Sequence, residues 1–356
     1  MKKTMSVSFL VGMIISGIAL YFAFRKVPFA ELIAYLKSID YFWTIPATLL
    51  ILLAFALRVY RWRIILGATR RVGFWDAFHP LMIGFMLNCI LPGRVGEISR
   101  PLILNQKTSV PFSTGLATVA AERAFDVVVL LLLLSWMLMD VKIDPALTIT
   151  VGSYVLNKSL LMATATGIAR LCFLLVAAMI LLGFESCRNF FNRMILLLPR
   201  LFFFAGASFR QWVHEKVCLT LIRFMDSFAK GFLLLKDPKR MIGCFLLSLL
   251  IWGVSALSYY VMAMGAPGIR LSLSQLSVVM VIICVFISIP SAPGFWGIWE
   301  AGGVFALALF NIPAKDAAGF TLANHAFQML PVILVGAGSA IMTGVNVFQI
   351  SRVPQA

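Results

Sequence analysis

Charged residues are scarce in this sequence, and acidic residues are scarcer than basic ones. Only 12% of the 356 residues are Asp, Glu, Lys or Arg, with 14 acidic residues against 30 basic residues. This leaves too little polar surface to cover a soluble globule of this length. The composition therefore excludes an ordinary soluble fold, and the 61% share of hydrophobic residues indicates an integral membrane protein.

Signatures of metal, nucleotide and nucleic-acid binding are missing as well. The six cysteines form no C-x-x-C pair and have no His at ligand spacing, so we interpret them as small apolar side chains. No P-loop, dinucleotide or zinc pattern is present, so no cofactor and no metal are predicted. The net charge of +16 comes from basic residues beside apolar segments, which indicates contact with anionic lipid headgroups and not with nucleic acid.

Two matching motifs stand out within the apolar sequence. Residues 92–97 read P-G-R-V-G-E, and residues 293–297 read P-G-F-W-G, with Glu300 close behind. The segment E-R-A-F-D at 122–126 begins 30 residues after the first motif, and N-H-A-F-Q at 324–328 begins 31 residues after the second. This correspondence predicts a diverged duplication, with broken apolar segments of the kind found in transporters whose site lies between repeats.

Proline and glycine in these motifs predict breaks at which a helix turns back inside the membrane. Proline lacks an amide donor, and glycine tolerates dihedral angles that other residues avoid. Such a re-entrant turn requires that its unpaired backbone face protein or water. The predicted structural breaks are Pro92, Gly93, Gly96, Pro293, Gly294 and Gly297.

Apolar stretches of sufficient length give the predicted topology. Full spans are predicted at residues 5–24, 41–57, 113–139, 168–184, 241–264 and 317–345. Shorter helices at 77–91 and 276–289 each continue past a break, to about Leu104 and Phe310. The fold class is an all-α polytopic membrane protein with an inverted repeat: six full spans plus two opposed re-entrant helical hairpins, or eight membrane segments.

Three parts follow from this topology. Residues 1–184 form the first membrane repeat, residues 185–240 a basic amphipathic cytoplasmic linker, and residues 241–356 the second membrane repeat. The linker either lies passively in the headgroup region or recruits anionic lipid. The basic residues that follow residue 57, Arg58 and Arg61 among them, are interpreted as a cytoplasmic cluster. Both termini are then cytoplasmic, in the cell membrane of a bacterium or archaeon.

The motifs carry a family resemblance. The run from Asn88 to Arg100 with L-P-G-R-V-G-E, the later A-E-R-A-F-D and the final A-P-G-F-W-G resemble the lysylphosphatidylglycerol synthase transmembrane-region family. The resemblance implies a flippase-like domain that moves aminoacylated phosphatidylglycerol between leaflets, without the synthase domain of multiple peptide resistance factors. Phe295 departs from the family pattern, which usually has a second glycine there.

Nine residues are candidates for substrate binding, because a phosphate crossing the membrane needs fixed charges in place of water. Arg94 and Arg123 suit the phosphate, which a guanidinium binds bidentately, and the carboxylates balance the arginines or hold a cationic headgroup. The half-helices after the breaks would aim their positive ends at the anion. The candidates are Arg94, Glu97, Arg100, Glu122, Arg123, Asp126, Glu300, Asn324 and His325.

Several candidates also have a structural interpretation. Glu122, Arg123 and Asp126 are spaced to form an ion pair that locks two helices, and Arg100 is placed to snorkel to the membrane interface.

Residues near the two breaks have such interpretations too. Glu300 is placed to cap a half-helix, and His325 suits a packed, hydrogen-bonded core position. Asn88 is expected to satisfy loop amides.

Lipid translocation is the function that the sequence favours, with no enzymatic activity of the chain itself. The alternatives are a membrane-embedded lipid phosphatase-like enzyme, for which the two motifs lack a serine nucleophile, and a small-solute secondary transporter. The expected partners are a membrane phospholipid, anionic headgroups and a separate lipid-modifying enzyme, and a homo-oligomer is compatible with the sequence. Passive transport and proton coupling through Glu97, Glu122, Asp126 or His325 both stay open.

Overall fold

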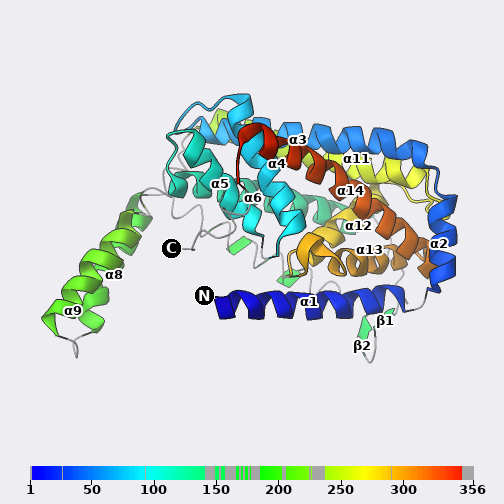
Figure 1. The fold of residues 1–356 in the computed structure, drawn as a ribbon, viewed down its shortest axis with the longest axis horizontal. Helices are drawn as coiled ribbons and strands as arrows, with labels where there is room; N and C mark the ends of the chain where they lie inside the picture. Colours follow the sequence, from blue (N-terminus) through cyan, green and yellow to red (C-terminus); the bar gives the residue numbers. More distant parts are fainter. Residues whose placement is uncertain are drawn as a thin grey trace.

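The structure is a computed structural model of the chain (Figure 1). It describes residues 2–25, 27–92, 94–140, 149–151, 154–156, 166–167, 170, 173–174, 177, 185–202, 206–223, 226, 237–289 and 291–346. The predicted span at 168–184 therefore lies largely outside the described residues. The predicted break residue Gly93 lies outside them too.

The first part of the chain is helical throughout its described residues. The elements are α1 (Lys2–Phe24), α2 (Phe29–Ser38), the short 3-10 helix η1 (Tyr41–Trp43), α3 (Thr44–Leu66), α4 (Phe74–Ile90), α5 (Val95–Lys107) and α6 (Phe112–Asp140). Two features differ from the sequence prediction. The link before the second span contains the helix α2, and α3 continues nine residues beyond the predicted end at residue 57, so that Arg58 and Arg61 lie within the helix.

The middle of the chain holds short elements. These are the antiparallel strands β1 (Ile149–Val151) and β2 (Tyr154–Leu156), α8 (Glu185–Leu201), α9 (Ala207–Trp212) and the π-helix η2 (Val213–Cys218). The strand pair is an addition to the predicted helical fold. In Figure 1, α8 and α9 lie away from the main bundle.

The last part of the chain is also built from helices. It contains α11 (Pro238–Met264), α12 (Leu273–Phe286), the 3-10 helix η4 (Pro293–Phe295), α13 (Ile298–Ala308) and α14 (Ala314–Thr343). Local signals begin two of these helices. Asp237 accepts a hydrogen bond from the Arg240 amide with Pro238 in the first turn, and Ser272 and Gln275 form a capping box.

Both helix breaks contain a residue with left-handed backbone, at the same position of the two motifs. Arg94, the third residue of the first motif, has φ 53°, and Phe295, the third residue of the second, has φ 60°. Gly294 and Gly297 also have positive φ, at 70° and 88°. A positive φ ends a right-handed helix, which explains why α5 begins directly after Arg94 and α13 directly after Gly297.

The bundle brings the two breaks together. Helices α3 and α11 run side by side along one edge of the bundle in Figure 1, and α14 packs against α4. At the second break, the backbone of Gly294 approaches the end of α4 so closely that a Cβ there would lie 2.9 Å from the Cys89 carbonyl oxygen. The second break therefore lies against the C-terminal end of α4, which leads into the first break.

The helical fold is confirmed, whereas the exact number of spans stays a prediction. Among the described residues, three helices are long and apolar enough to cross a membrane, at Tyr41–Leu66, Pro238–Met264 and Ala314–Thr343. A fourth span results if the bent pair Gly12–Phe24 and Phe29–Ser38 counts as one. Helix α6 has 29 residues but carries several charges. The six spans, the inverted sidedness and the three-part division remain predictions.

Candidate functional site

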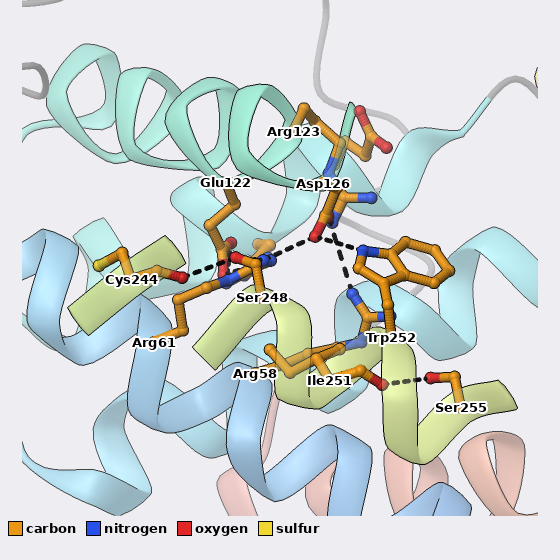
Figure 2. A network of polar contacts seen from close by, with 12 residues as sticks. Arg58, Arg61, Glu122, Arg123, Asp126, Cys244, Ser248, Ile251, Trp252 and Ser255 are labelled. Atoms are coloured by element: carbon orange, nitrogen blue, oxygen red, sulfur yellow. Dashed lines mark hydrogen bonds and ion pairs between the residues drawn. The ribbon is translucent and has the colours of Figure 1, made fainter. Parts of the chain in front are cut away.

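Arg61 of α3 is the centre of a buried polar network (Figure 2). Its Nη1 atom donates to Asp126 Oδ1 on α6 at 2.6 Å and to Ser248 Oγ on α11 at 2.7 Å. One guanidinium thus joins three helices. Because a helix inside an apolar medium satisfies its own backbone, such side-chain contacts are what fix the helices relative to one another.

Arg100 of α5 enters the same network from another side. Its Nη2 atom lies 2.6 Å from Glu122 Oε2, and Glu122 Oε1 lies 3.6 Å from Arg61 Nη2. The Arg100 guanidinium carbon also sits 3.7 Å from the ring centroid of Trp62, a cation–π contact. Arg100 is buried, so the prediction that it snorkels to the interface is wrong. Its partner carboxylate holds it inside the bundle.

Asp126 collects further donors. Trp252 Nε1 donates to Asp126 Oδ1 at 3.2 Å, Arg123 Nη2 lies 3.4 Å from Oδ2, and Arg58 Nη1 lies 3.8 Å from Oδ2. Figure 2 shows these side chains converging on the carboxylate from α3, α6 and α11. The predicted ion pair between helices is therefore present, and its principal cations come from α3 and α5 as well as from α6 itself.

The network carries an excess of positive charge. Four arginines, at 58, 61, 100 and 123, face the two carboxylates of Glu122 and Asp126, which leaves two positive charges when all are ionised. The Nε atoms of Arg61, Arg100 and Arg123 are buried and form no hydrogen bond with any described residue. Buried donors without an acceptor are costly, so this arrangement is complementary to an added anion.

The first break lies at the partly exposed margin of this network. The Arg94 and Glu97 side chains are 41% and 32% exposed and lie 3.9 Å apart, and the Arg123 side chain is 34% exposed. Arg94 Nη2 also donates to the Ile287 carbonyl at 2.7 Å, at the end of α12. Arg94 thus connects the first break to the second half of the chain.

The half-helix ends after both breaks already have side-chain partners. Asn88 Oδ1 accepts a hydrogen bond from the Gly96 amide at 2.8 Å, and Glu300 Oε2 accepts one from the Gly297 amide at 2.7 Å. The structural interpretations of Asn88 and Glu300 are confirmed. One amide at the start of each half-helix is thus paired within its own hairpin, and the expectation that these positive helix ends face an anion stays a prediction.

The second break forms a separate buried site. His325 Nδ1 of α14 lies 2.6 Å from Glu300 Oε1, and His325 Nε2 lies 2.9 Å from the Gly294 carbonyl oxygen. The interpretation of His325 as a packed, hydrogen-bonded core residue is confirmed. Asn324 precedes it on α14 and is buried too.

The structure therefore divides the nine predicted residues into three sets. Four of them share the central network: Arg100, Glu122, Arg123 and Asp126. Two lie at its margin, Arg94 and Glu97. Three lie at the second break: Glu300, Asn324 and His325.

The sequence prediction missed Arg58 and Arg61 as site residues. Both were assigned to a cytoplasmic cluster, but both are buried and paired with acidic residues of α6. Their i,i+3 spacing puts them on one helix face, and this was the available signal. Two arginines on one face of an apolar helix predict a buried partner as readily as an interface.

Comparisons with known proteins show a family and two relatives. The model of the family described as "Lysylphosphatidylglycerol synthase TM region" matches residues 9–336. The UPF0104 membrane protein of Methanothermobacter thermautotrophicus is 23% identical over 357 residues, covering 96% of this chain and 94% of the relative. Glycosyltransferase AglD of Haloferax volcanii is 26% identical over 128 residues, which are 35% of this chain and 20% of that protein. No solved structure matches the chain significantly.

Proposed function

The chain belongs to the lysylphosphatidylglycerol synthase transmembrane-region family, and on this premise we propose that it moves a phospholipid with an anionic or aminoacylated headgroup between membrane leaflets. The excess of two positive charges around Arg61, in a network where three of the four arginines are buried, is the observation that carries the proposal. A phosphate on its way across the membrane needs such a surrogate for water. Guanidinium groups supply it best because their fork matches phosphate oxygens.

Arginines at different depths support a path for the headgroup. Arg94 and Arg123 are about a third or more exposed and would meet the phosphate first, whereas Arg61 and Arg100 are buried. Glu97 at the margin would accept the amine of an aminoacyl group. The acyl chains would stay in the surrounding lipid, beside the exposed apolar residues of the outer helices.

The same residues support transport over catalysis. The two Pro-Gly motifs contain no serine, and the family concerned is the transmembrane region as distinct from a synthase domain. A lipid-modifying enzyme would then act as a separate partner. An isoprenoid-linked phosphate is a second substrate class, because it offers the arginines the same phosphate group.

A proteoliposome assay tests the proposal. Purified protein is reconstituted with phosphatidylglycerol, lysyl-phosphatidylglycerol or an isoprenoid phosphate, each fluorescently labelled in one leaflet, and the label is followed with a membrane-impermeant quencher. We expect faster equilibration than in protein-free vesicles, and a rate about tenfold to a hundredfold lower for Arg123→Gln, the loss that corresponds to one charge-assisted hydrogen bond of about 1.5–3 kcal/mol.

Arg71→Gln is the matched control, because Arg71 is an exposed arginine outside the network. It should leave the rate unchanged. Folded protein that accelerates none of the three lipids would refute lipid translocation, and equal losses in both variants would refute the assignment of the site.

A further inference from the structure

The contacts of His325 and Glu300 require one shared proton, which either the imidazole or the carboxyl group can carry. A carbonyl oxygen can only accept, so the 2.9 Å contact with the Gly294 carbonyl places a hydrogen on Nε2. The 2.6 Å contact between Nδ1 and Glu300 Oε1 then needs one more hydrogen, either on the imidazole or on the carboxyl group. Without it, two lone pairs would face each other.

The pair is sealed from solvent. Both side chains are 0% exposed, and the His325 ring stacks on Trp299 at 4.4 Å and 2°, with Trp296 4.4 Å away on another side. Among the described residues, Glu300 is the only charged group recorded in an ion pair with His325. The proton shared by these two residues is therefore held by them alone.

Neighbouring elements bring polar backbone but few charges to this place. From α1, the Ser16 hydroxyl accepts a hydrogen bond from the Ala292 amide at 2.8 Å, and the Ser16 carbonyl packs against Gly297. From α4, the Cys89 carbonyl lies near Gly294. None of these described groups supplies a second positive charge to replace the proton.

The shared proton holds the second break in shape. His325 fixes the Gly294 carbonyl, and Glu300 fixes the Gly297 amide, so the two residues clamp both ends of a turn that contains three left-handed residues in four. Left-handed backbone is strained for Phe295, and such strain persists only where the surroundings enforce it. Without the proton, the contact between His325 Nδ1 and Glu300 Oε1 would become repulsive.

From this geometry we infer that Glu300 and His325 form a proton-binding site that locks the break between α12 and α13, and that release of the proton unlocks it. The coupling of this lock to lipid movement rests on the function proposed above. Since Gly294 lies against the Cys89 carbonyl at the end of α4, a change of shape at the second break changes the surface that α4 packs against.

Glu300→Gln is the decisive variant. A glutamine carbonyl can still accept from the Gly297 amide while its amide nitrogen donates to His325 Nδ1, so all three hydrogen bonds persist without a titrating proton. His325→Phe keeps the stack with the tryptophans and removes both nitrogens, which gives the unlocked reference.

Hydrogen–deuterium exchange of the segment 291–299 reads the lock directly, in the full-length protein and without lipid transport. Wild type and Glu300→Gln are compared at each pH from about 5 to about 9, so that the intrinsic pH dependence of exchange cancels. We expect equal protection at low pH and at least about tenfold faster exchange of wild type at high pH, approaching His325→Phe. A constant ratio across this range would overturn the proposal.

Nitrogen-15 NMR of the His325 ring in the wild-type protein provides a second measurement, which does not depend on any variant being folded. The chain has only three histidines, so the His325 signals are readily separated from those of His79 and His214. Ring nitrogen shifts of His325 that stay fixed over the same pH range would also overturn the proposal. If the lock titrates but lipid rates do not follow it, the proton site stands and only its coupling to transport fails.

Discussion

Gly96→Ala should lower the stability of the protein strongly, because α4 and α5 cross at this residue with almost no space between their backbones. A Cβ on Gly96 would overlap the Gly84 carbonyl oxygen and would lie 2.6 Å from both the Gly84 carbonyl carbon and Asn88 Oδ1. Real Cβ contacts stay beyond 3.0 Å. The helices must therefore separate by at least 0.4 Å, and by more where the oxygen is met.

The expected cost follows from two opposing effects. Alanine in a helix is favoured over glycine by about 0.5–1 kcal/mol. Overpacking a tight contact costs about 1–3 kcal/mol or more, and here the obstacle is backbone that cannot rotate away. Displacement of Asn88 would add the loss of its cap on α5, about 1 kcal/mol. The net change is a destabilisation of about 1–3 kcal/mol.

Gly253→Ala is the matched control. Gly253 lies in the interior of α11 and has open space where a Cβ would be, so only the helix preference acts. Thermal unfolding of both variants in the same detergent, followed by loss of the monodisperse peak in size-exclusion chromatography, should lower the apparent Tm for Gly96→Ala and slightly raise it for Gly253→Ala. An unchanged or raised Tm for Gly96→Ala would refute the close crossing.

Three further predictions use the same stability measurement. Phe295→Gly should be more stable than Phe295→Ala by about 1 kcal/mol, since both remove the ring but only glycine relieves the left-handed backbone; equal stability would contradict the positive φ. Asp126→Asn should cost about 3–5 kcal/mol, because it leaves Arg61 buried without its closest counter-charge, and a change below about 1 kcal/mol would count against the network. Asn88→Ala should cost about 1 kcal/mol through loss of the Gly96 cap, and a neutral result would contradict that hydrogen bond.

The helices and breaks were predictable because their causes are local. The length and apolarity of the segments determine the helices. The Pro-Gly motifs at 92 and 293 interrupt a helix whatever the tertiary fold is. The predicted short helix at 77–91 and the observed α4 (Phe74–Ile90) differ by a few residues. By contrast, α2 was read as a link, because ten residues between two apolar runs carry too weak a pattern to predict a helix.

The central network was only half predictable because its pairs are distant in the chain. Glu122, Arg123 and Asp126 stand out as charges in one apolar segment. Arg61 does not, because its partner Asp126 is 65 residues away and basic residues beside a span are usually interfacial.

A similar limit applies at the second break. Glu300 and His325 were both chosen as candidates, but their separation of 25 positions in the chain conceals that they bind each other. Spacing along a helix tells which face a residue occupies, not which helix that face meets.

The hydrogen bond from Arg94 to the Ile287 carbonyl couples the first break to the second half of the chain. The Ile287 carbonyl at the end of α12 has no further turn of helix to pair with, and Arg94 supplies its donor. Under the proposed function, an anion that took over this nitrogen would leave the end of α12 without its donor, which would weaken anion binding by about 1.5–3 kcal/mol, or about tenfold to a hundredfold. Thermodynamic reciprocity would make the converse equally large: a movement of α12 away from Arg94 would raise the anion affinity proposed for the first break by the same factor.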